Sequence, residues 1–367
     1  MATYKIALIG TGRVGYQFDF DPELPDNHAS AILKVERAEL VAGVNRGREK
    51  LEQFGKRFQV EALYHDYEKM LDEVQPDICI IATHPELHCE MVLGCASRPS
   101  TKAIICEKPM ALSLGECDRM IEACDAAGIL LQINHNRRWS AEWNYAKQLV
   151  DEGAIGTLNH IYVSMDGCKP SPSWRSENEG PLLHDFTHSF DQIDMIAGEI
   201  DWLCGMAEQR MRPWAVEDFS AAMIRFKSGA TGLVHGAELT EYQSFEFELR
   251  GTTGVIRIEK ENIQLSQSVE QMVEPDSGFS WSTLQPKEVE HPAPVSTYVV
   301  ALEELLDVLE GKATLRSDGN IGRRSMEVVM AIYQSQLQDC AKVSFPISMM
   351  DPGVQELRQS GNFTDKT

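Results

Sequence analysis

The sequence predicts an α/β fold, in which a doubly wound parallel sheet is followed by an α+β domain with an open, mostly antiparallel sheet. In the first third of the chain, short apolar runs alternate with stretches of helical character. This alternation is typical of a parallel sheet with helices on both faces. After residue 134, several strand-like runs follow one another closely and are separated by turn glycines, which favours antiparallel pairing.

Five apolar runs in the first part, each stopped by turn or polar residues, are predicted as buried strands. They cover residues 4–9, 38–44, 77–83, 103–109 and 129–134. The stretches between them are predicted to contain helices at 27–36, 67–74, 86–96 and 114–127.

A helix predicted over 141–152 introduces the second part of the chain. The strand-like runs after it are LNHIYVSM, AAMIRFK, TGLVHGAEL, FEFELRG and VIRIEK, and further helices are predicted at 298–309 and 322–341. The last residues are polar and are expected to fray. We therefore expect one domain over 1–133, a second over 134–345 and a tail over 346–367.

Composition excludes several classes of partner. The 367 residues include 34 Lys and Arg against 56 Asp and Glu, a formal net charge of −22, which repels nucleic acid and anionic membranes. No apolar run approaches the ~18–20 residues of a membrane span, and no secretory leader precedes the first strand. The nine cysteines are odd in number and form no C-x-x-C, so we expect reduced thiols in a cytoplasmic protein.

A glycine motif directly follows the first predicted strand. Gly10, Gly12 and Gly15 fit G-x-G-x-x-G, with Arg13 and Val14 inside the motif. At the start of a βαβ unit this pattern indicates dinucleotide binding, with Gly10 making the tight turn, Gly12 admitting the pyrophosphate and Gly15 allowing helix packing. A glycine-rich turn without a ligand is the alternative.

The end of the second predicted strand bears on the choice of cofactor. An acidic residue that binds the ribose of NAD is usual there, but this chain has Asn45, Arg46 and Arg48, after an insertion over 17–28. Asn45 does not repel a 2′-phosphate, and Arg46 or Arg48 could hold one. The residues favour NADP(H) over NAD(H); the alternative is that Asn45 binds the ribose of NAD and the arginines are solvated.

Several further motifs, taken in order, resemble the Gfo/Idh/MocA oxidoreductases. From Ile6 to about Ser335 they are IALIGTGRVG, Ala82-Thr83 followed by Pro85 and His88, Glu107-Lys108-Pro109, Asn136-Arg137-Arg138-Trp139, Gly153-Ala154-Ile155-Gly156, Trp174-Arg175 and His188-x-x-Asp191. The resemblance implies an N-terminal Rossmann domain that binds NAD(P) and a C-terminal domain that binds a sugar or cyclitol. It also implies a homo-dimer or homo-tetramer, in which the open sheet often forms the interface.

The resemblance also implies a catalytic pair. Lys108 would hydrogen-bond the reacting hydroxyl and stabilise its oxygen, and His188 would act as the general base. The family has an Asp four residues before this His, whereas this chain has His184 there and Asp185 one residue later. We expect His184 in the substrate pocket, with Asp185 orienting a histidine or capping the helix; ordinary core histidines are the alternative. Without a third ligand cluster, no metal site is expected.

Other residues carried over from the resemblance have weaker support. Thr83, His84, His88 and Glu107 would contact the cofactor together with Lys108, and Arg138 and Trp174 would contact the substrate. Interdomain salt bridges for Arg138 and simple packing for Trp174 are equally compatible with the sequence.

The resulting hypothesis is an enzyme, an NAD(P)-dependent dehydrogenase or reductase of a sugar, glycoside or cyclitol. Two alternatives remain. One is a redox-cycling glycosidase that returns its NAD to the starting state. The other is a non-enzymatic dinucleotide sensor, which the presence of Lys108 and His188 disfavours.

Overall fold

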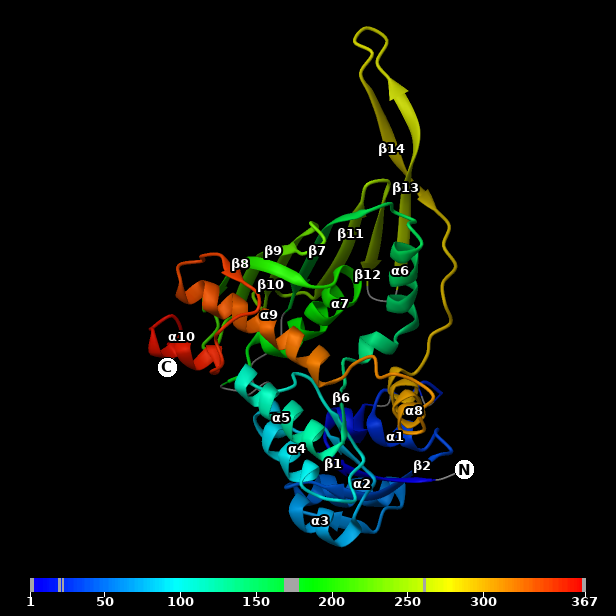
Figure 1. The fold of residues 1–367 in the computed structure, drawn as a ribbon, viewed down its shortest axis with the longest axis vertical. Coiled ribbons are helices and arrows are strands. Elements are labelled where there is room, and N and C mark those ends of the chain that lie inside the picture. The colour runs from blue at the N-terminus through cyan, green and yellow to red at the C-terminus, as the bar shows by residue number, and fades with distance from the viewer. Residues whose placement is uncertain (1–2, 19–20, 22, 168–177, 260–261, 365–367) are drawn as a thin grey trace. The chain divides into compact units, whose positions relative to one another are not determined.

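The computed structural model describes residues 3–18, 21, 23–167, 178–259 and 262–364. The chain divides into two compact units, each built from two segments (Figure 1). The first unit comprises 1–140 and 294–326, and the second comprises 141–293 and 327–367.

The first unit contains the predicted parallel sheet. Its strands are β1 (Tyr4–Ile9), β2 (Ala38–Val44), β3 (Ala62–Tyr64), β4 (Ile78–Ile81), β5 (Ala103–Cys106) and β6 (Leu130–Ile133), in the order β3-β2-β1-β4-β5-β6. Every neighbouring pair is parallel. The connections therefore reverse direction between β1 and β4, which is where ligands bind in open α/β sheets. The three-residue strand β3 is not predicted from the sequence.

Short and long helices lie between these strands and directly after the last of them. They are η1 (Arg13–Gln17), α1 (His28–Ile32), α2 (Arg48–Phe58), α3 (Tyr67–Val74), η2 (Pro85–Leu87), α4 (His88–Ala96), α5 (Leu114–Ala127) and η3 (Asn136–Trp139). The bounds of α5 are those predicted, because Ser113 caps its N-terminus through the amide of Glu116 and Gly128, at φ 67°, ends it.

Helix α8 (Thr297–Leu309) also belongs to the first unit, although its residues fall in the range predicted for the second domain. Leu302, Leu305 and Leu306 lie on one face of the helix, and all three are buried in the same apolar cluster as Ile6 and Ile80 of the parallel sheet. Their i, i+3, i+4 spacing predicts a buried helix face but does not reveal which sheet the helix covers.

The second unit contains a nine-stranded sheet in the order β14-β13-β12-β11-β7-β10-β9-β8-β15. The strands are β7 (Leu158–Asp166), β8 (Ile200–Glu208), β9 (Phe219–Phe226), β10 (Thr231–Ala237), β11 (Ser244–Gly251), β12 (Gly254–Glu259), β13 (Asn262–Val273), β14 (Ser280–Lys287) and β15 (Val343–Ser344). Only β7 and β10 pair in parallel, so the mostly antiparallel prediction is confirmed. Strands β8, β13, β14 and β15 are not predicted from the sequence.

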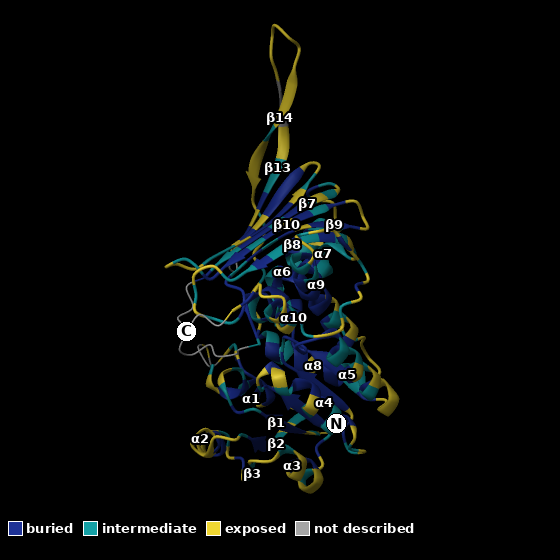
Figure 2. Ribbon diagram, turned by 90° about the vertical axis from the view of Figure 1, so that its left-hand side faces the viewer, coloured by how far each residue is buried: buried dark blue, intermediate teal, exposed yellow. Residues whose placement is uncertain are grey.

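Helices α6 (Ala141–Asp151), η4 (Leu182–Phe186), α7 (Thr187–Ala197) and α10 (Gly353–Gln359) lie in the second unit, and α9 (Gly319–Leu337) begins in the first unit and ends in the second. Within the predicted tail, Val354, Leu357 and Phe363 are buried. Of the last residues, which are expected to fray, 365–367 lie outside the described residues. Figure 2 shows that strand β14 is largely exposed.

The eight cysteines of the described residues are free thiols, and six of them are buried. Burial raises the pKa of Cys124 to about 12 and raises the pKa of Cys106 well above its ordinary value. These thiols are neutral and unreactive at pH 7, as expected for packing residues.

Within the described part of the chain, no helix combines the length and the apolar character that crossing a membrane requires.

Candidate functional site

The glycine loop after β1 is shaped by close backbone contacts. Gly10 has φ +104°, and a Cβ atom on it would lie 2.4 Å from the carbonyl oxygen of Ala82. A Cβ on Gly15 would lie 2.2 Å from the carbonyl oxygen of Gly10. Both positions therefore exclude every side chain, and they hold the loop against the carboxyl end of β4.

Gly12 differs from its two partners, because a Cβ atom there would meet nothing within 4 Å. The open space lies at the N-terminus of η1, where backbone amides favour an anion. A side chain at position 12 would therefore project into this open space, which is where the motif expects a pyrophosphate to approach the backbone. Of the neighbouring residues, Val14 packs against the core and the exposed Arg13 guanidinium lies 4.5 Å from the centre of the Phe18 ring.

The end of β2 presents a neutral side chain and an exposed cation. Asn45 Oδ1 accepts a hydrogen bond from the amide of Gly47 at 2.7 Å, which closes a tight turn. Arg46 is exposed and forms no ion pair with the described residues, whereas Arg48 pairs with Glu52 at 2.6 Å. The end of β2 therefore has no carboxylate at position 45 and has an exposed guanidinium next to it.

The end of β4 contributes one accessible and one buried histidine. Thr83 is half-buried and His84 is exposed, next to the start of η2. His88 is fully buried, with Nδ1 2.9 Å from the carbonyl oxygen of Pro109 and Nε2 3.2 Å from that of Thr83. His88 therefore links the loop after β4 to the loop after β5. Its side chain is buried beneath both loops and bonds to their carbonyl oxygens.

Glu107 and Lys108 follow β5, at the same edge of the sheet. The Glu107 carboxylate is buried and accepts hydrogen bonds from His28 Nε2 at 2.8 Å, from Asn134 Nδ2 at 2.6 Å and from the Lys108 amide at 3.3 Å. Burial alone would raise the pKa of Glu107, but the hydrogen bonds from His28 and Asn134 and the nearby Lys108 ammonium hold the pKa below its ordinary value. Glu107 is thus ionised, and its hydrogen bonds fix the backbone from which the half-buried Lys108 side chain extends.

Arg138 and Trp174, the two further residues expected to contact substrate, differ in what the structure describes of them. Arg138 in η3 is 8% exposed, and its carbonyl oxygen accepts a hydrogen bond from Arg316 at 3.2 Å. Trp174 lies outside the described residues, as does the neighbouring Arg175.

In the second unit, His184, Asp185 and His188 lie on one continuous helical stretch formed by η4 and α7, and all three are half-buried. The η4 segment is a π-helical turn, a feature often found at functional sites. His184 Nδ1 lies 2.8 Å from Glu179 Oε1, and Glu179 is buried. The carboxylate beside His184 Nδ1 thus comes from Glu179, which sequence analysis does not identify. No local pattern links the two, because Glu179 precedes the helix.

The carboxylate at the start of this helix is Glu217, from a distant segment. Its Oε1 accepts a hydrogen bond from the amide of Leu182 at 2.9 Å, whereas Pro181, at the N-cap, provides no side-chain cap.

Among the described residues, no group of three or more His, Cys, Asp and Glu side chains is arranged to hold a metal ion.

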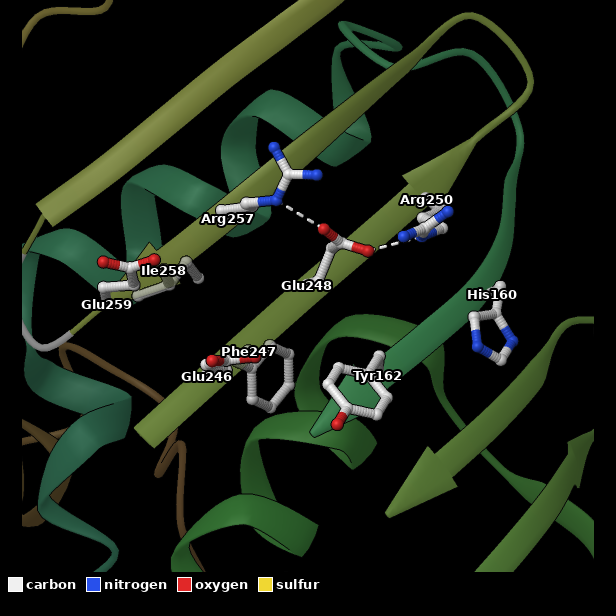
Figure 3. Close-up of a pocket in the computed structure, with 9 residues that line it drawn as sticks. All are labelled: His160, Tyr162, Glu246, Phe247, Glu248, Arg250, Arg257, Ile258 and Glu259. Carbon is white, nitrogen blue, oxygen red and sulfur yellow. Dashed lines mark hydrogen bonds and ion pairs between the residues drawn. The ribbon is translucent and has the colours of Figure 1, made fainter. Parts of the chain in front are cut away.

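A hollow of about 510 Å³ on the nine-stranded sheet is separate from these groups (Figure 3). The residues that line it are His160, Tyr162, Glu246, Phe247, Glu248, Arg250, Arg257, Ile258 and Glu259. Both arginines bond to the carboxylate of Glu248. None of the residues predicted for the cofactor or for catalysis lines this hollow, so it is not part of the candidate site.

Comparison with known proteins finds family matches in both parts of the chain. Residues 4–135 match the family described as an oxidoreductase family with an NAD-binding Rossmann fold, and residues 143–257 match the GFO/IDH/MocA C-terminal domain. A myo-inositol 2-dehydrogenase of Thermotoga maritima is 26% identical over 267 residues, which is 71% of this chain and 76% of that protein. A D-apiose dehydrogenase of Paraburkholderia graminis is 30% identical over 236 residues, 63% of this chain and 60% of that protein.

Solved structures share the fold. The WlbA dehydrogenase from Bordetella pertussis, in complex with NADH and UDP-GlcNAcA, has a TM-score of 0.78 at 22% identity and covers 95% of this chain and 100% of its own. Levoglucosan dehydrogenase, in complex with NADH and L-sorbose, has a TM-score of 0.80 at 20% identity, with the same coverage.

Proposed function

Because the chain belongs to the GFO/IDH/MocA oxidoreductase family, we propose that it transfers hydride between NAD(P) and a hydroxyl-bearing carbon of a sugar, glycoside or cyclitol. The curated relatives support this class of substrate, since they include inositol and apiose dehydrogenases. We further propose that the glycine loop holds the cofactor and that Lys108 and His188 act on the substrate.

One observation in the first unit carries the proposal. The glycine loop, Thr83 and Lys108 follow β1, β4 and β5, which are adjacent and parallel. Their carboxyl ends therefore meet at one edge of the sheet, beside the point where the connections reverse. This arrangement supports a site that holds a dinucleotide at the glycine loop and presents the Lys108 ammonium to its substrate.

The residues of this chain divide the work of the reaction. When bound, the nicotinamide supplies the position that accepts or gives the hydride. The Lys108 ammonium stabilises negative charge on the substrate oxygen, and His188 takes the hydroxyl proton. The Glu179 carboxyl group, 2.8 Å from His184 Nδ1, holds the His184 ring in a fixed orientation beside His188.

The test is an absorbance assay for reduced nicotinamide. The purified protein is mixed with NAD⁺ or NADP⁺ and a panel of cyclitols, aldoses and glycosides. We expect the reduced band to form with one class of substrate and in proportion to the enzyme. A protein that binds neither cofactor would contradict the proposal, and release of the aglycone from a glycoside without net reduction would assign the redox-cycling reaction instead.

We also propose that NADP(H) is the preferred cofactor, supported by the neutral Asn45 and the exposed Arg46. Replacing Arg46 by alanine is expected to lower kcat/KM for NADP⁺ by about 10- to 100-fold, the effect of one charge-assisted hydrogen bond. The value for NAD⁺ should change little. Steady-state kinetics with both cofactors measure this.

Lys56→Ala is the matched control, because it removes an exposed cation from helix α2. Its kcat/KM should equal that of the wild type with both cofactors. A wild-type preference for NAD⁺, or an equal loss for the two cofactors in Arg46→Ala, would contradict the assignment of NADP(H).

A further inference from the structure

The helical stretch that carries His184 and His188 begins without a cap of its own. Helix η4 starts at Leu182, and neither Pro181 nor Phe186 caps the stretch with a side chain. The first amides of a helix lack partners inside it, so an outside acceptor fixes where the helix starts. Here that acceptor is Glu217 Oε1, which is 2.9 Å from the amide nitrogen of Leu182.

Glu217 is fully buried and is held on its other side. Its Oε2 accepts a hydrogen bond from the hydroxyl of Tyr333 in α9 at 3.1 Å, and Tyr333 is also fully buried. A Cβ atom at position 180 would lie 2.2 Å from each carboxyl oxygen of Glu217, so Gly180 allows the carboxyl group to rest directly on the backbone. The carboxyl group is therefore fixed between the helix start and α9.

The same short segment fixes His184. Glu179, one residue before Gly180, has its Oε1 2.8 Å from His184 Nδ1. The amide of His184 also donates to the carbonyl oxygen of Gly180 at 2.9 Å. Any movement of the helix start away from Glu217 therefore displaces both the backbone and the ring partner of His184.

We propose that Glu217, held by Tyr333, is a positioning residue that anchors the start of the histidine-bearing helix so that His184 and His188 are aligned for proton transfer. The proposal rests on the catalytic role proposed above for the two histidines. It assigns Glu217 no contact with substrate or cofactor, and its effect passes through the backbone of residues 180–184.

The chemistry of the carboxyl group allows a discriminating variant. Burial raises the pKa of Glu217 to about 7, although the hydrogen bonds from Leu182 and Tyr333 oppose this rise, and Asp218 adds to it. Two further charged groups lie near Tyr333: Glu179, which raises the pKa of the tyrosine, and Arg358, which lowers it. Both the ionised and the protonated carboxyl accept the Leu182 amide, as does the carbonyl of a glutamine. Glu217→Gln should therefore keep the anchor, whereas Glu217→Ala removes it.

The experiment compares these two variants by amide hydrogen exchange and by kinetics. In Glu217→Ala, exchange over residues 182–188 should rise by about tenfold, as expected for the loss of a buried hydrogen bond. Its kcat should fall by about 10²-fold through misalignment, with the KM for the cofactor unchanged. Glu217→Gln should restore both properties to within about threefold of the wild type.

Asp218→Asn is the matched control, because Asp218 is equally buried but accepts hydrogen bonds from the amides of residues 210–212 instead. It should leave exchange over 182–188 unchanged. If Glu217→Ala does not fold, Tyr333→Phe removes one support of the carboxyl and should change exchange and kcat in the same direction.

Unchanged exchange in Glu217→Ala would overturn the inference, as would equal losses of kcat in the alanine and glutamine variants. A wild-type protein without hydride transfer would refute the proposed function alone, because the exchange measurement still decides whether Glu217 anchors the helix.

Discussion

Replacing Lys108 by methionine is expected to lower kcat by about 10²- to 10³-fold, the usual cost of removing a group that stabilises charge on the reacting oxygen. Methionine keeps most of the length of the side chain and removes the ammonium. The support behind it stays, because Glu107 is bonded to His28 and Asn134 through its own carboxylate.

Steady-state kinetics with the best substrate from the absorbance assay measure this effect. Lys102→Met provides the matched control, since Lys102 is exposed at the other end of β5 and pairs with Asp77 at 2.7 Å. The control should keep the full kcat. A Lys108→Met enzyme with kcat within about threefold of the wild type would exclude an electrostatic role for this residue.

Glu217→Gln is expected to stabilise the protein at pH 8.5 by about 3 kcal/mol. Burial raises the pKa of Glu217 from 4.5 to about 7, so the folded protein holds its proton over a range where the unfolded chain has lost it. Stability from this group is present below pH 4.5 and declines as the pH rises to about 7. Above that value the full cost of a buried, ionised carboxylate remains, and glutamine removes it.

Urea denaturation at pH 5 and pH 8.5 measures the difference in free energy of unfolding between the variant and the wild type. At pH 5 the folded wild type is already protonated at Glu217, so the two proteins should differ by less than about 1 kcal/mol. An equal difference at both pH values would show that Glu217 does not titrate near neutrality.

The predictions from sequence succeed where a structure depends on neighbours in the chain. Helix α5 begins after Ser113 and ends at Gly128, and both signals are local. Strand β3 has only three residues, too few for a pattern to emerge. Strand β13 reads NIQLSQSVEQMV, which lacks a regular apolar face, and it pairs because β12 and β14 lie on either side of it.

The candidate site divides in the same way. The glycine loop and the Glu107-Lys108-Pro109 segment are contiguous motifs, and the structure gives each a specific geometry. The supports of these motifs are not contiguous. His28 lies 79 residues before Glu107, and Glu217 lies 35 residues after Leu182. Such contacts depend on the folded topology, so a single sequence contains no signal for them.

The interleaving of the two units has a consequence for how the protein is made. The first 140 residues emerge from the ribosome long before residues 294–326, which belong to the same unit, have been synthesised. Until then the apolar face that Leu302, Leu305 and Leu306 cover in the finished core stays exposed to solvent. The first unit therefore cannot complete its fold while residues 141–293 are being synthesised. The two units finish folding together rather than one after the other.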